Sequence, residues 1–308
     1  MKYIIGIDAG GTKSELIAYD LDFSPVYCKT GGFGNPAVNL DKTVNNIISL
    51  IGECVTDLGR EDCVFIAIGM AAVETGNYAQ LIKEYVERAF VVDAVVLNDA
   101  ELACKAYFGE KDGILAIAGT GSSCYVQKSG KGQMVGGWSH ILGDEGSGYH
   151  TVIEVFKNIV NKYDKDIPFD KLSNSMLEKI GGTSRSDIMD FIYSNEKNTI
   201  ASLFPVIVDF SMQGDRYAVE LLENAGRHLA ELTCTAYKKA GFNGNVTIGL
   251  KGGIFHNSCF IVSSYINEIQ TCLKDFEIIG EDISATRGAC SIYKQNYNGG
   301  KIAPKNLQ

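Results

Sequence analysis

Two kinds of hydrophobic spacing divide the chain into predicted strands and predicted helices. Residues 64–68 form an uninterrupted apolar run that ends at Gly69, which is typical of a strand buried on both faces of a parallel sheet. Residues 40–58 instead place apolar side chains three and four positions apart, as one face of a helix requires. The same criteria predict further strands at 3–8, 15–20, 25–29, 91–97, 114–118, 122–127, 133–136, 246–250 and 276–279. They predict further helices at 78–90, 100–107, 147–163, 216–240, 258–273 and 286–297, with more helices between about 169 and 211.

The predicted elements come in two similar runs. The first half has the order β-β-β-α-β-α-β-α, and the second half begins again with three strands near residue 114. This alternation predicts an α/β fold. In open α/β sheets, ligands bind beyond the carboxyl ends of the strands. Polar or glycine residues occupy those ends here: Asp8, Gly69, Asp99, Gly119 and Gly252.

Length and charge narrow the classes of function. The 308 residues suffice for two domains of ordinary size, and 45% apolar with 21% charged residues is typical of a globular protein. The 28 basic and 37 acidic residues give a net charge of −9, which argues against a nucleic acid or a membrane surface as partner. Asp8 interrupts the first apolar run too early for a signal peptide, and the longest apolar stretch, residues 64–73, is about half a membrane span. We therefore expect a cytoplasmic protein.

The nine cysteines are odd in number, scattered along the chain and contain no Cys-x-x-Cys pair. With only four histidines besides, they suggest neither a zinc site nor a disulfide framework. Reduced, mostly buried thiols fit this pattern best.

The first turn with candidate chemistry follows the first strand. Asp8 ends that strand, and Gly10, Gly11, Thr12 and Lys13 lead into the second strand. Glycines let the backbone approach an anion closely, while the threonine and lysine side chains add hydrogen-bond donors and positive charge. Mg²⁺ accepts carboxylate oxygens, so Asp8 is the candidate metal residue, acting through a water molecule. The order Gly-Thr-Lys before a strand differs from the P-loop, and an ordinary hairpin turn is the alternative.

The same pattern recurs about one domain later. An apolar strand is again followed by glycine and hydroxyl residues, here Gly119, Thr120, Gly121 and Ser122. Two such turns favour a duplicated architecture that holds a nucleotide between them. The later copy has Ala118 where the earlier copy has Asp8, so only the first turn offers a carboxylate to a metal.

Asp99 is the candidate general base. It follows a predicted buried strand and precedes a predicted helix, next to Asn98. A carboxylate in that place can accept a hydroxyl proton, and phosphoryl transfer needs one such group to orient its nucleophile. The alternative is that Asp99 only caps the helix, because aspartate is a favoured N-cap residue.

The densest polar cluster spans residues 136–147. It contains the only tryptophan, Trp138, next to Gly137, and then Asp144 before a predicted helix. An aromatic face beside carboxylates suits a sugar, whose C–H faces pack on rings while its hydroxyls donate to carboxylates. The alternative is a tryptophan in the core with Asp144 as a helix cap.

Gly252 and Gly253 form a third glycine turn, between a predicted strand and a predicted helix. A turn without side chains lets a flat base or a ribose lie against the backbone. An ordinary strand–helix turn explains these two glycines equally well.

Taken together, these motifs resemble the actin–hexokinase ATPase superfamily and, within it, the BadF/BadG-type ATPases, which include N-acetylglucosamine kinases. The resemblance runs from Ile4 to about Ile292, and its specific element is Gly-Asp-Glu-Gly-Ser at 143–147 after Gly-Gly-Trp at 136–138. The glycine turns mark only the superfamily. The other matching segments are 8–14, Asn35, 98–100, 119–122, 213–215, 252–253 and 287–289.

The resemblance implies two RNase-H-like domains of the actin/hexokinase type with a nucleotide and sugar cleft between them. We place the N-terminal domain at 1–112, joined by a returning helix at about 286–297. The C-terminal domain is placed at 113–285, with a helical insertion at about 164–215.

The resemblance also implies the roles of the site residues. Asp99 would deprotonate the 6-hydroxyl of the sugar, and Asp8 would serve Mg²⁺. The implied sugar-binding residues are Asn35, Asn98, Asp99, Gly137, Trp138 and Asp144. The implied ATP-binding residues are Gly10, Gly11, Thr12, Lys13, Gly119, Thr120, Gly121, Ser122, Gly252 and Gly253.

The sequence thus predicts an ATP- and Mg²⁺-dependent kinase of N-acetylglucosamine, and we also expect a homodimer. Residues 69–74 lack the small hydroxyl residue that such kinases often place near the sugar, so N-acetylmuramic acid and glucosamine stay open as substrates. Some relatives instead hydrolyse ATP to activate other enzymes and bind an iron–sulfur cluster through cysteines. This alternative ranks lower, because the cysteines here are not closely arranged.

Overall fold

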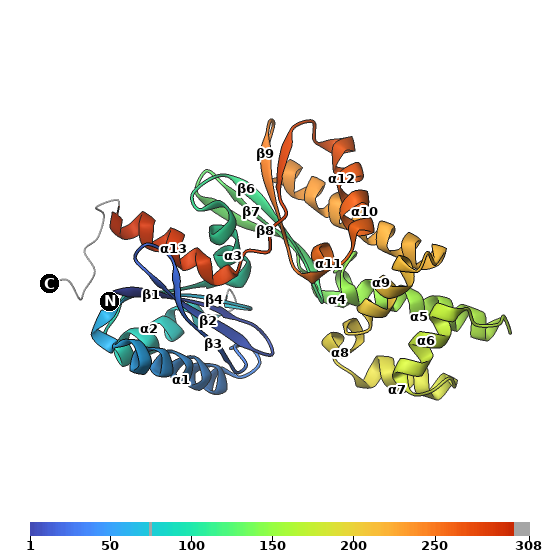
Figure 1. Cartoon of the computed structure of the whole chain (residues 1–308), viewed down its shortest axis with the longest axis horizontal. Coiled ribbons are helices and arrows are strands. Elements are labelled where there is room, and N and C mark those ends of the chain that lie inside the picture. Colours follow the sequence, from blue (N-terminus) through green and yellow to red (C-terminus); the bar gives the residue numbers. More distant parts are fainter. Residues whose placement is uncertain (74–75, 299–308) are drawn as a thin grey trace. The chain divides into compact units, whose positions relative to one another are not determined.

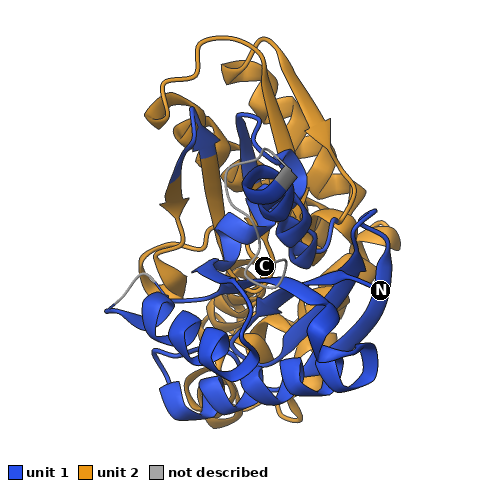
Figure 2. Ribbon diagram, turned by 90° about the vertical axis from the view of Figure 1, so that its left-hand side faces the viewer, with its two compact units in different colours: residues 1–115, 127–132, 283–308 blue, residues 116–126, 133–282 orange. Residues whose placement is uncertain are grey.

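The computed structural model describes residues 1–73 and 76–298, and it divides the chain into two compact units. Unit 1 comprises residues 1–115, 127–132 and the chain from Ile283 onward. Unit 2 comprises residues 116–126 and 133–282, and the two units are coloured separately in Figure 2. Glu74, the last residue of the segment that departs from the N-acetylglucosamine kinase pattern, lies outside the described residues.

The first sheet has five strands in the order β3-β2-β1-β4-β5. β1 pairs antiparallel with β2 and parallel with β4, and β4 pairs parallel with β5. The carboxyl ends of β1, β4 and β5 therefore lie at the same edge of the sheet. The strands are β1 Tyr3–Ala9, β2 Ser14–Asp20, β3 Pro25–Gly31, β4 Cys63–Met70 and β5 Ala94–Asn98.

Helices cover both faces of this sheet, as Figure 1 shows. Successive side chains of a strand point to opposite faces, so Ile5 and Ile7 pack with α1 and α2, whereas Ile4 packs with α3 and α13. The helices of unit 1 are α1 Leu40–Leu58, α2 Tyr78–Phe90, α3 Asp99–Phe108 and α13 Gly288–Tyr293. Short helical turns lie at Arg60–Asp62, Ala285–Arg287 and Lys294–Asn298.

The second sheet repeats the strand order of the first. Its order is β10-β9-β6-β7-β8, so each strand occupies the position that its counterpart five strands earlier has in the first sheet. The strands are β6 Gly113–Ala118, β7 Ser122–Lys128, β8 Lys131–Gly136, β9 Val246–Lys251 and β10 Phe276–Ile279. Two five-stranded sheets joined with helices confirm the predicted α/β class.

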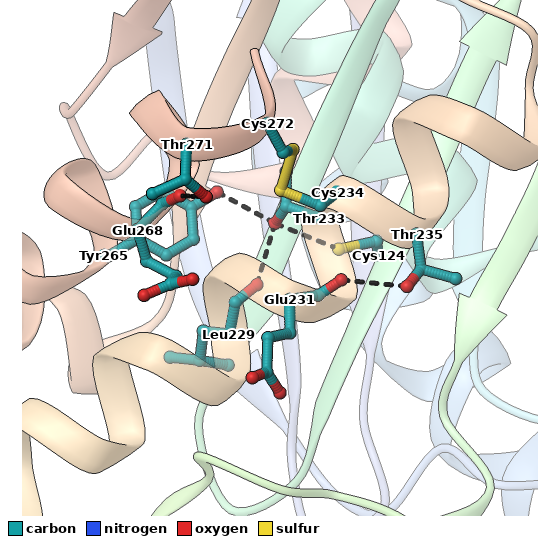
Figure 3. The surroundings of a disulfide bond; sticks show 10 residues. All are labelled: Cys124, Leu229, Glu231, Thr233, Cys234, Thr235, Tyr265, Glu268, Thr271 and Cys272. Carbon is teal, nitrogen blue, oxygen red and sulfur yellow. Dashed lines mark hydrogen bonds between the residues drawn. A yellow bond between two sulfur atoms is a disulfide. The ribbon is translucent and has the colours of Figure 1, made fainter.

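The helices of unit 2 fall into a pair against the sheet and an insertion. In the pair, α10 packs along α12, and Thr233 of α10 contacts both Tyr265 of α12 and Cys124 of β7 (Figure 3). The insertion consists of four short helices that pack on one another and on α5. The helices are α4 Ser139–Leu142, α5 Gly148–Asp164, α6 Lys171–Ile180, α7 Arg185–Ser194, α8 Lys197–Ala201, α9 Phe204–Met212, α10 Arg216–Lys239, α11 Gly253–His256 and α12 Cys259–Cys272.

The structure corrects the expectation that all thiols are reduced. Cys234 of α10 and Cys272 at the end of α12 form a disulfide, with 6.3 Å between their Cα atoms (Figure 3). The two helices pack side by side and bring together residues 38 positions apart, which the cysteine spacing alone does not reveal. The expectation of mostly buried thiols is confirmed for the rest, since five of the seven free cysteines are buried. Burial raises the pKa of the Cys124 thiol, for example, to about 12.

Local signals explain where the predicted boundaries hold and where they shift. α1 begins at Leu40, as the spacing predicts, and the Asn39 side chain caps this start by accepting a hydrogen bond from the Lys42 N–H (2.9 Å). The strand predicted from residue 91 begins only at Ala94, because Val91 ends α2 in a left-handed conformation with φ of 55°. Within residues 1–73 and 76–298, no helix is both long and apolar enough to cross a membrane.

The last helical segment closes over the first sheet within unit 1. The hydroxyl groups of Tyr19 and Thr286 lie 2.8 Å apart, and Gly6 of β1 faces the Thr286 backbone. A Cβ atom on Gly6 would overlap the Thr286 carbonyl oxygen, and one on Gly288 would overlap that of Leu102. Glycine is therefore required where this returning segment meets β1 and α3.

We predict that Gly6→Ala destabilises the protein by about 3 kcal/mol, because its methyl group must displace buried backbone rather than a flexible side chain. Gly52→Ala is the control, since Gly52 lies half-buried in the interior of α1 and nothing is within 4 Å of its Cβ position. That change should stabilise the protein by about 0.5–1 kcal/mol. Urea unfolding followed by circular dichroism measures both, and equal effects of the two substitutions would refute the steric argument.

Candidate functional site

In unit 1, the carboxylates of Asp8 and Asp99 lie at one edge of the first sheet. Asp8 on β1 is in register with Gly69 on β4, and Gly69 is in register with Leu97 on β5. Asp99 follows two residues later as the first residue of α3. Because neighbouring strands are about 4.8 Å apart, the two chain segments that carry these carboxylates are separated by about 10 Å. That spacing leaves room for a phosphate group between a metal ligand and a base.

Gly69 allows α3 to begin close to β4. A Cβ atom at this position would lie 2.7 Å from the Leu102 Cβ and 3.3 Å from the Asp99 Cα. Any side chain here would push the start of α3 away from the sheet. The glycine that ends the predicted strand therefore has a packing role, which fixes where Asp99 sits.

The side chains of Asn98 and Asp99 both contact the start of α3. Asn98 is the N-cap residue of α3, and its side chain accepts a hydrogen bond from the Ala100 N–H at 2.9 Å. Asp99 occupies the first helical position, half-buried, with its Oδ1 2.8 Å from the same N–H. Asn98 therefore holds the N-cap position, and Asp99 shares the same N–H group.

The first glycine turn is held by a second glycine loop. Within the turn, the Gly10 N–H donates to the Lys13 carbonyl at 3.0 Å, and the Gly34 N–H donates to the Gly10 carbonyl at 2.9 Å. Asn35 directly follows Gly34, and its side chain accepts a hydrogen bond from the Ala37 N–H at 3.0 Å. Gly11, Thr12 and Lys13 are exposed, as phosphate donors must be.

In unit 2, the β6–β7 turn is tied to the start of α5. The Gly119 N–H donates to the Gly121 carbonyl (2.9 Å), and the N–H groups of Gly148 and Tyr149 donate to the carbonyls of Gly119 (2.9 Å) and Thr120 (3.3 Å). The first N–H groups of a helix lack partners within it. Here two of them hold the turn in place.

Asp144 is buried against the same turn. Its Oδ1 accepts a hydrogen bond from the Ser122 N–H at 3.3 Å, and its Oδ2 lies 3.5 Å from the Lys197 Nζ. A Cβ atom on Gly121 would lie 2.7 Å from that Oδ2, so the turn approaches the carboxylate closely. Asp144 does not cap α5, because Ser147 is the N-cap residue.

Trp138 is 71% exposed, which excludes the alternative of a core tryptophan. It begins the short helix α4, between glycines with positive φ and the Asp144 turn. A cavity of about 350 Å³ adjoins these residues, within the usual size range of small-molecule sites. Its lining includes Ser122, Gly136, Trp138, Asp144, Glu145 and Lys239.

Gly252 meets the end of β6. Its φ is +102°, and a Cβ atom there would overlap the Ala118 carbonyl oxygen. The adjacency of β6 and β9 in the sheet brings the Gly252–Gly253 turn beside the β6–β7 turn, and Gly253 begins α11. The predicted glycine turns of the second half therefore converge at one edge of the second sheet.

The sequence-predicted residues thus form one group in each unit. Asp8, Gly10–Lys13, Asn35, Asn98 and Asp99 belong to the edge of the first sheet, and 119–122, 137–138, Asp144 and 252–253 to that of the second. Two further residues, Lys197 and His150, contact this second group and carry no motif that singles them out. Lys197 is 53 positions from Asp144, so only the fold reveals the contact.

His150 supports the turn that carries Asp144. Its Nδ1 accepts a hydrogen bond from the Gly146 N–H at 3.4 Å, and its Nε2 lies 3.9 Å from Glu154. Burial lowers the pKa of His150 below its usual 6.5, although the nearby Glu154 carboxylate acts in the opposite direction. The neutral ring is the form that can accept the Gly146 hydrogen bond.

The residues near Asp8 fit a magnesium ion that arrives with a nucleotide. Mg²⁺ in such sites keeps several waters and takes one or two carboxylates together with phosphate oxygens. A single carboxylate at a strand end meets that need. In the described part of the chain no three His, Cys, Asp or Glu side chains form a ready-made metal cage.

Two sheets with one strand order, each with a glycine turn after its first strand, are the arrangement of the actin/hexokinase-like fold. The chain belongs to the BadF/BadG/BcrA/BcrD ATPase family, whose model matches residues 5–283. The predicted family resemblance is therefore confirmed.

Two relatives with named activities cover most of the chain. The N-acetylmuramic acid/N-acetylglucosamine kinase of Clostridium acetobutylicum is 30% identical over 273 residues, which are 86% of this chain and 89% of the relative. The N-acetyl-D-glucosamine kinase of Dictyostelium discoideum is 26% identical over 256 residues, 78% of this chain and 80% of that protein.

Solved structures share the fold. A candidate N-acetylglucosamine kinase from Chromobacterium violaceum superposes with a TM-score of 0.77 at 20% identity, covering 94% of this chain and 98% of that one. A ROK family glucokinase from Streptomyces griseus, determined with glucose and AMPPNP, superposes with a TM-score of 0.58 at 17% identity, covering 94% of this chain and 97% of that one.

We predict that His150 makes stability depend on pH below about 6.5. Because its pKa is lowered in the folded state, the unfolded chain binds the proton first, and the free energy of unfolding falls as the pH drops below 6.5. The loss is about 1.4 kcal/mol for each unit by which the pKa is lowered, as an upper limit for this half-buried ring. His150→Gln should remove this part of the fall.

Urea unfolding at pH 5 to 8 measures this fall in the free energy of unfolding. His140→Gln is the control, because His140 is exposed. Parallel stability curves for the parent and His150→Gln would contradict the prediction.

Proposed function

We propose that this protein is an ATP-dependent kinase of amino sugars that phosphorylates the 6-hydroxyl of N-acetylglucosamine. N-acetylmuramic acid and glucosamine are the further candidate substrates. The observation that carries the proposal is the position of Asp8 and Asp99 at the same edge of one sheet, at the carboxyl ends of two strands that flank β4. Membership of the ATPase family and the names of the curated relatives support it.

Asp99 is proposed as the general base. Its carboxylate accepts the proton of the sugar hydroxyl as that oxygen attacks the terminal phosphorus of ATP, and the bond from this phosphorus to the bridging oxygen breaks, so that ADP leaves. Proton transfer of this kind contributes about 10²- to 10⁴-fold to rate. The packing of α3 against Gly69 and the Asn98 cap fix the carboxylate, so that little reorganisation is needed in the reaction.

The glycine turns are proposed to hold the phosphates of ATP. Gly11, Thr12, Thr120 and Gly121 are the proposed donors through backbone N–H groups and hydroxyls, with the Lys13 ammonium as positive charge. Gly10, Gly119 and Ser122 shape the two turns, because their N–H groups donate to acceptors within the protein. Gly252 and Gly253 give the adenosine a surface without side chains. Because the net charge of the chain is −9, its overall electrostatic field repels the anionic phosphates of ATP, and the attraction of these local donors must exceed that repulsion.

Asp8 is proposed to hold Mg²⁺ through a bound water. The ion, when bound with ATP, neutralises charge that develops on the phosphate oxygens. The second turn has Ala118 at the position that corresponds to Asp8, so the protein supplies this carboxylate once.

The sugar is proposed to bind through Asn35, Asn98, Gly137, Trp138 and Asp144. The exposed indole of Trp138 offers its face to the C–H side of a pyranose, and the Asp144 carboxylate accepts hydrogen bonds from hydroxyls. The homodimer and the cytoplasmic location stay predictions of the sequence.

We predict that Asp99→Asn lowers kcat for sugar phosphorylation about 10²- to 10⁴-fold, because the amide cannot accept the hydroxyl proton. The KM for the sugar should change about threefold or less, since the amide keeps its shape and hydrogen-bonding capacity. A coupled assay of ADP release measures both constants. Asp41→Asn, an exposed aspartate of α1, is the matched control and should retain parental rates. Near-parental turnover of Asp99→Asn would refute the base assignment.

We predict that a sugar increases the rate of ADP release only if it is itself phosphorylated. N-acetylglucosamine, N-acetylmuramic acid, glucosamine and glucose are compared in the same assay, with phosphorylated sugar identified by mass spectrometry. With at least one amino sugar, the amount of ADP released should equal the amount of sugar phosphate formed. Hydrolysis that no sugar accelerates would overturn the kinase proposal and favour the alternative, an ATPase activator or switch protein that hydrolyses ATP without a sugar acceptor.

A further inference from the structure

We propose that Lys197 binds a carboxylate carried by the substrate and so makes this enzyme a kinase for acidic amino sugars, with N-acetylmuramic acid as the best substrate of the series. The proposal rests on the proposed kinase function. Under this proposal, Lys197 determines the specificity for a sugar whose lactyl ether carries a carboxylate over a neutral sugar.

The geometry places a lysine ammonium at the proposed sugar carboxylate. The Lys197 Nζ lies 3.5 Å from the Asp144 Oδ2, and both residues belong to unit 2. Lys197 is the first residue of α8, which packs on α5, the helix that follows the Asp144 turn. The insertion therefore delivers a positive charge to a turn far away in sequence.

Burial differs strongly between the two partners. The Asp144 side chain is 4% exposed, whereas that of Lys197 is 37% exposed. Elsewhere in the unit, Lys162 pairs with an Asp170 side chain that is 37% exposed, so a carboxylate as enclosed as Asp144 is not needed for an ordinary surface pair. The Lys197 side chain is thus the more exposed partner of the pair, and a ligand approaches from the solvent.

The contact is long for an ion pair, and an ammonium has three donors. One N–H toward Asp144 leaves two others for a second acceptor. A pyranose hydroxyl that donates to Asp144 brings the substituent on its neighbouring ring carbon close to the same region. A carboxylate there would accept hydrogen bonds from Lys197, and charge-assisted hydrogen bonds are about twice as strong as neutral ones.

A purely structural role for Lys197 gives different kinetics. If the ammonium only compensated the buried charge of Asp144, its loss would impair every sugar that Asp144 holds, to a similar degree. If it binds the substrate, its loss impairs the acidic sugar selectively. The ratio of kcat/KM for N-acetylmuramic acid to that for N-acetylglucosamine therefore separates the two roles.

The test compares this ratio in the parent, Lys197→Met, Lys197→Arg and the control Lys157→Met. Lys157 lies on α5, 65% exposed, and pairs with Glu154 at 2.6 Å. Lys197→Met should lower the ratio about 10- to 100-fold, the loss of one charge-assisted hydrogen bond. Lys197→Arg should keep most of the ratio, and Lys157→Met should leave it unchanged. An equal fall for both sugars in Lys197→Met would overturn the proposal.

A second measurement needs no variant. The parent enzyme is assayed with N-acetylmuramic acid and with its methyl ester, which has the same shape without the charge. The ester should show a kcat/KM about 10-fold lower or more. Equal values would refute carboxylate recognition even if Lys197→Met failed to fold.

The failures are distinguishable. Phosphorylation of N-acetylglucosamine but not of N-acetylmuramic acid by the parent would reject this inference and leave the kinase proposal intact. Phosphorylation of neither, nor of glucosamine, would reject the kinase proposal itself.

Discussion

The hydrogen bonds between the start of α5 and the β6–β7 turn are the constraint on which the second group of site residues depends. The N–H groups of Gly148 and Tyr149 bind the carbonyls of Gly119 and Thr120, so helix and turn cannot move independently. The segment between them carries Asp144, which closes back on the turn through the Ser122 N–H. One pair of backbone contacts thus positions a candidate phosphate turn and a candidate sugar carboxylate together. No side chain takes part in it, and the glycine at Gly121 keeps the approach open.

Much of this arrangement could be predicted from the sequence, because its signals are local. An apolar run such as residues 64–68 and a helical spacing such as that of residues 40–58 depend on a few neighbouring residues, and both elements appear where they were predicted. The family resemblance rests on motifs of the same short range and is confirmed. The two matching halves that the sequence predicts appear as two sheets with one strand order.

What the sequence could not predict depends on contacts between distant positions. The Cys234–Cys272 pair forms only because α10 lies along α12, and the Lys197–Asp144 pair only because the insertion folds back on α5. Neither has a spacing that a pattern could recognise. Val91 is a different case, since a β-branched residue is a poor choice for a left-handed helix end, and local propensity therefore misplaced the start of β5. The roles of the individual site residues stay predictions, because they concern ligands rather than packing.

The disulfide also affects the segment that contains the Gly252–Gly253 turn. Residues 234 to 272 form a closed loop that contains β9, Gly252, Gly253 and α12. Closing a loop of 38 residues lowers the entropy of the unfolded chain, in the simplest model by the equivalent of about 4 kcal/mol at 25 °C. That stabilisation belongs to unit 2 alone. The segment proposed to bind adenosine is therefore more stable when Cys234 and Cys272 are oxidised to the disulfide, whereas neither cysteine lies in the sheet that bears Asp8.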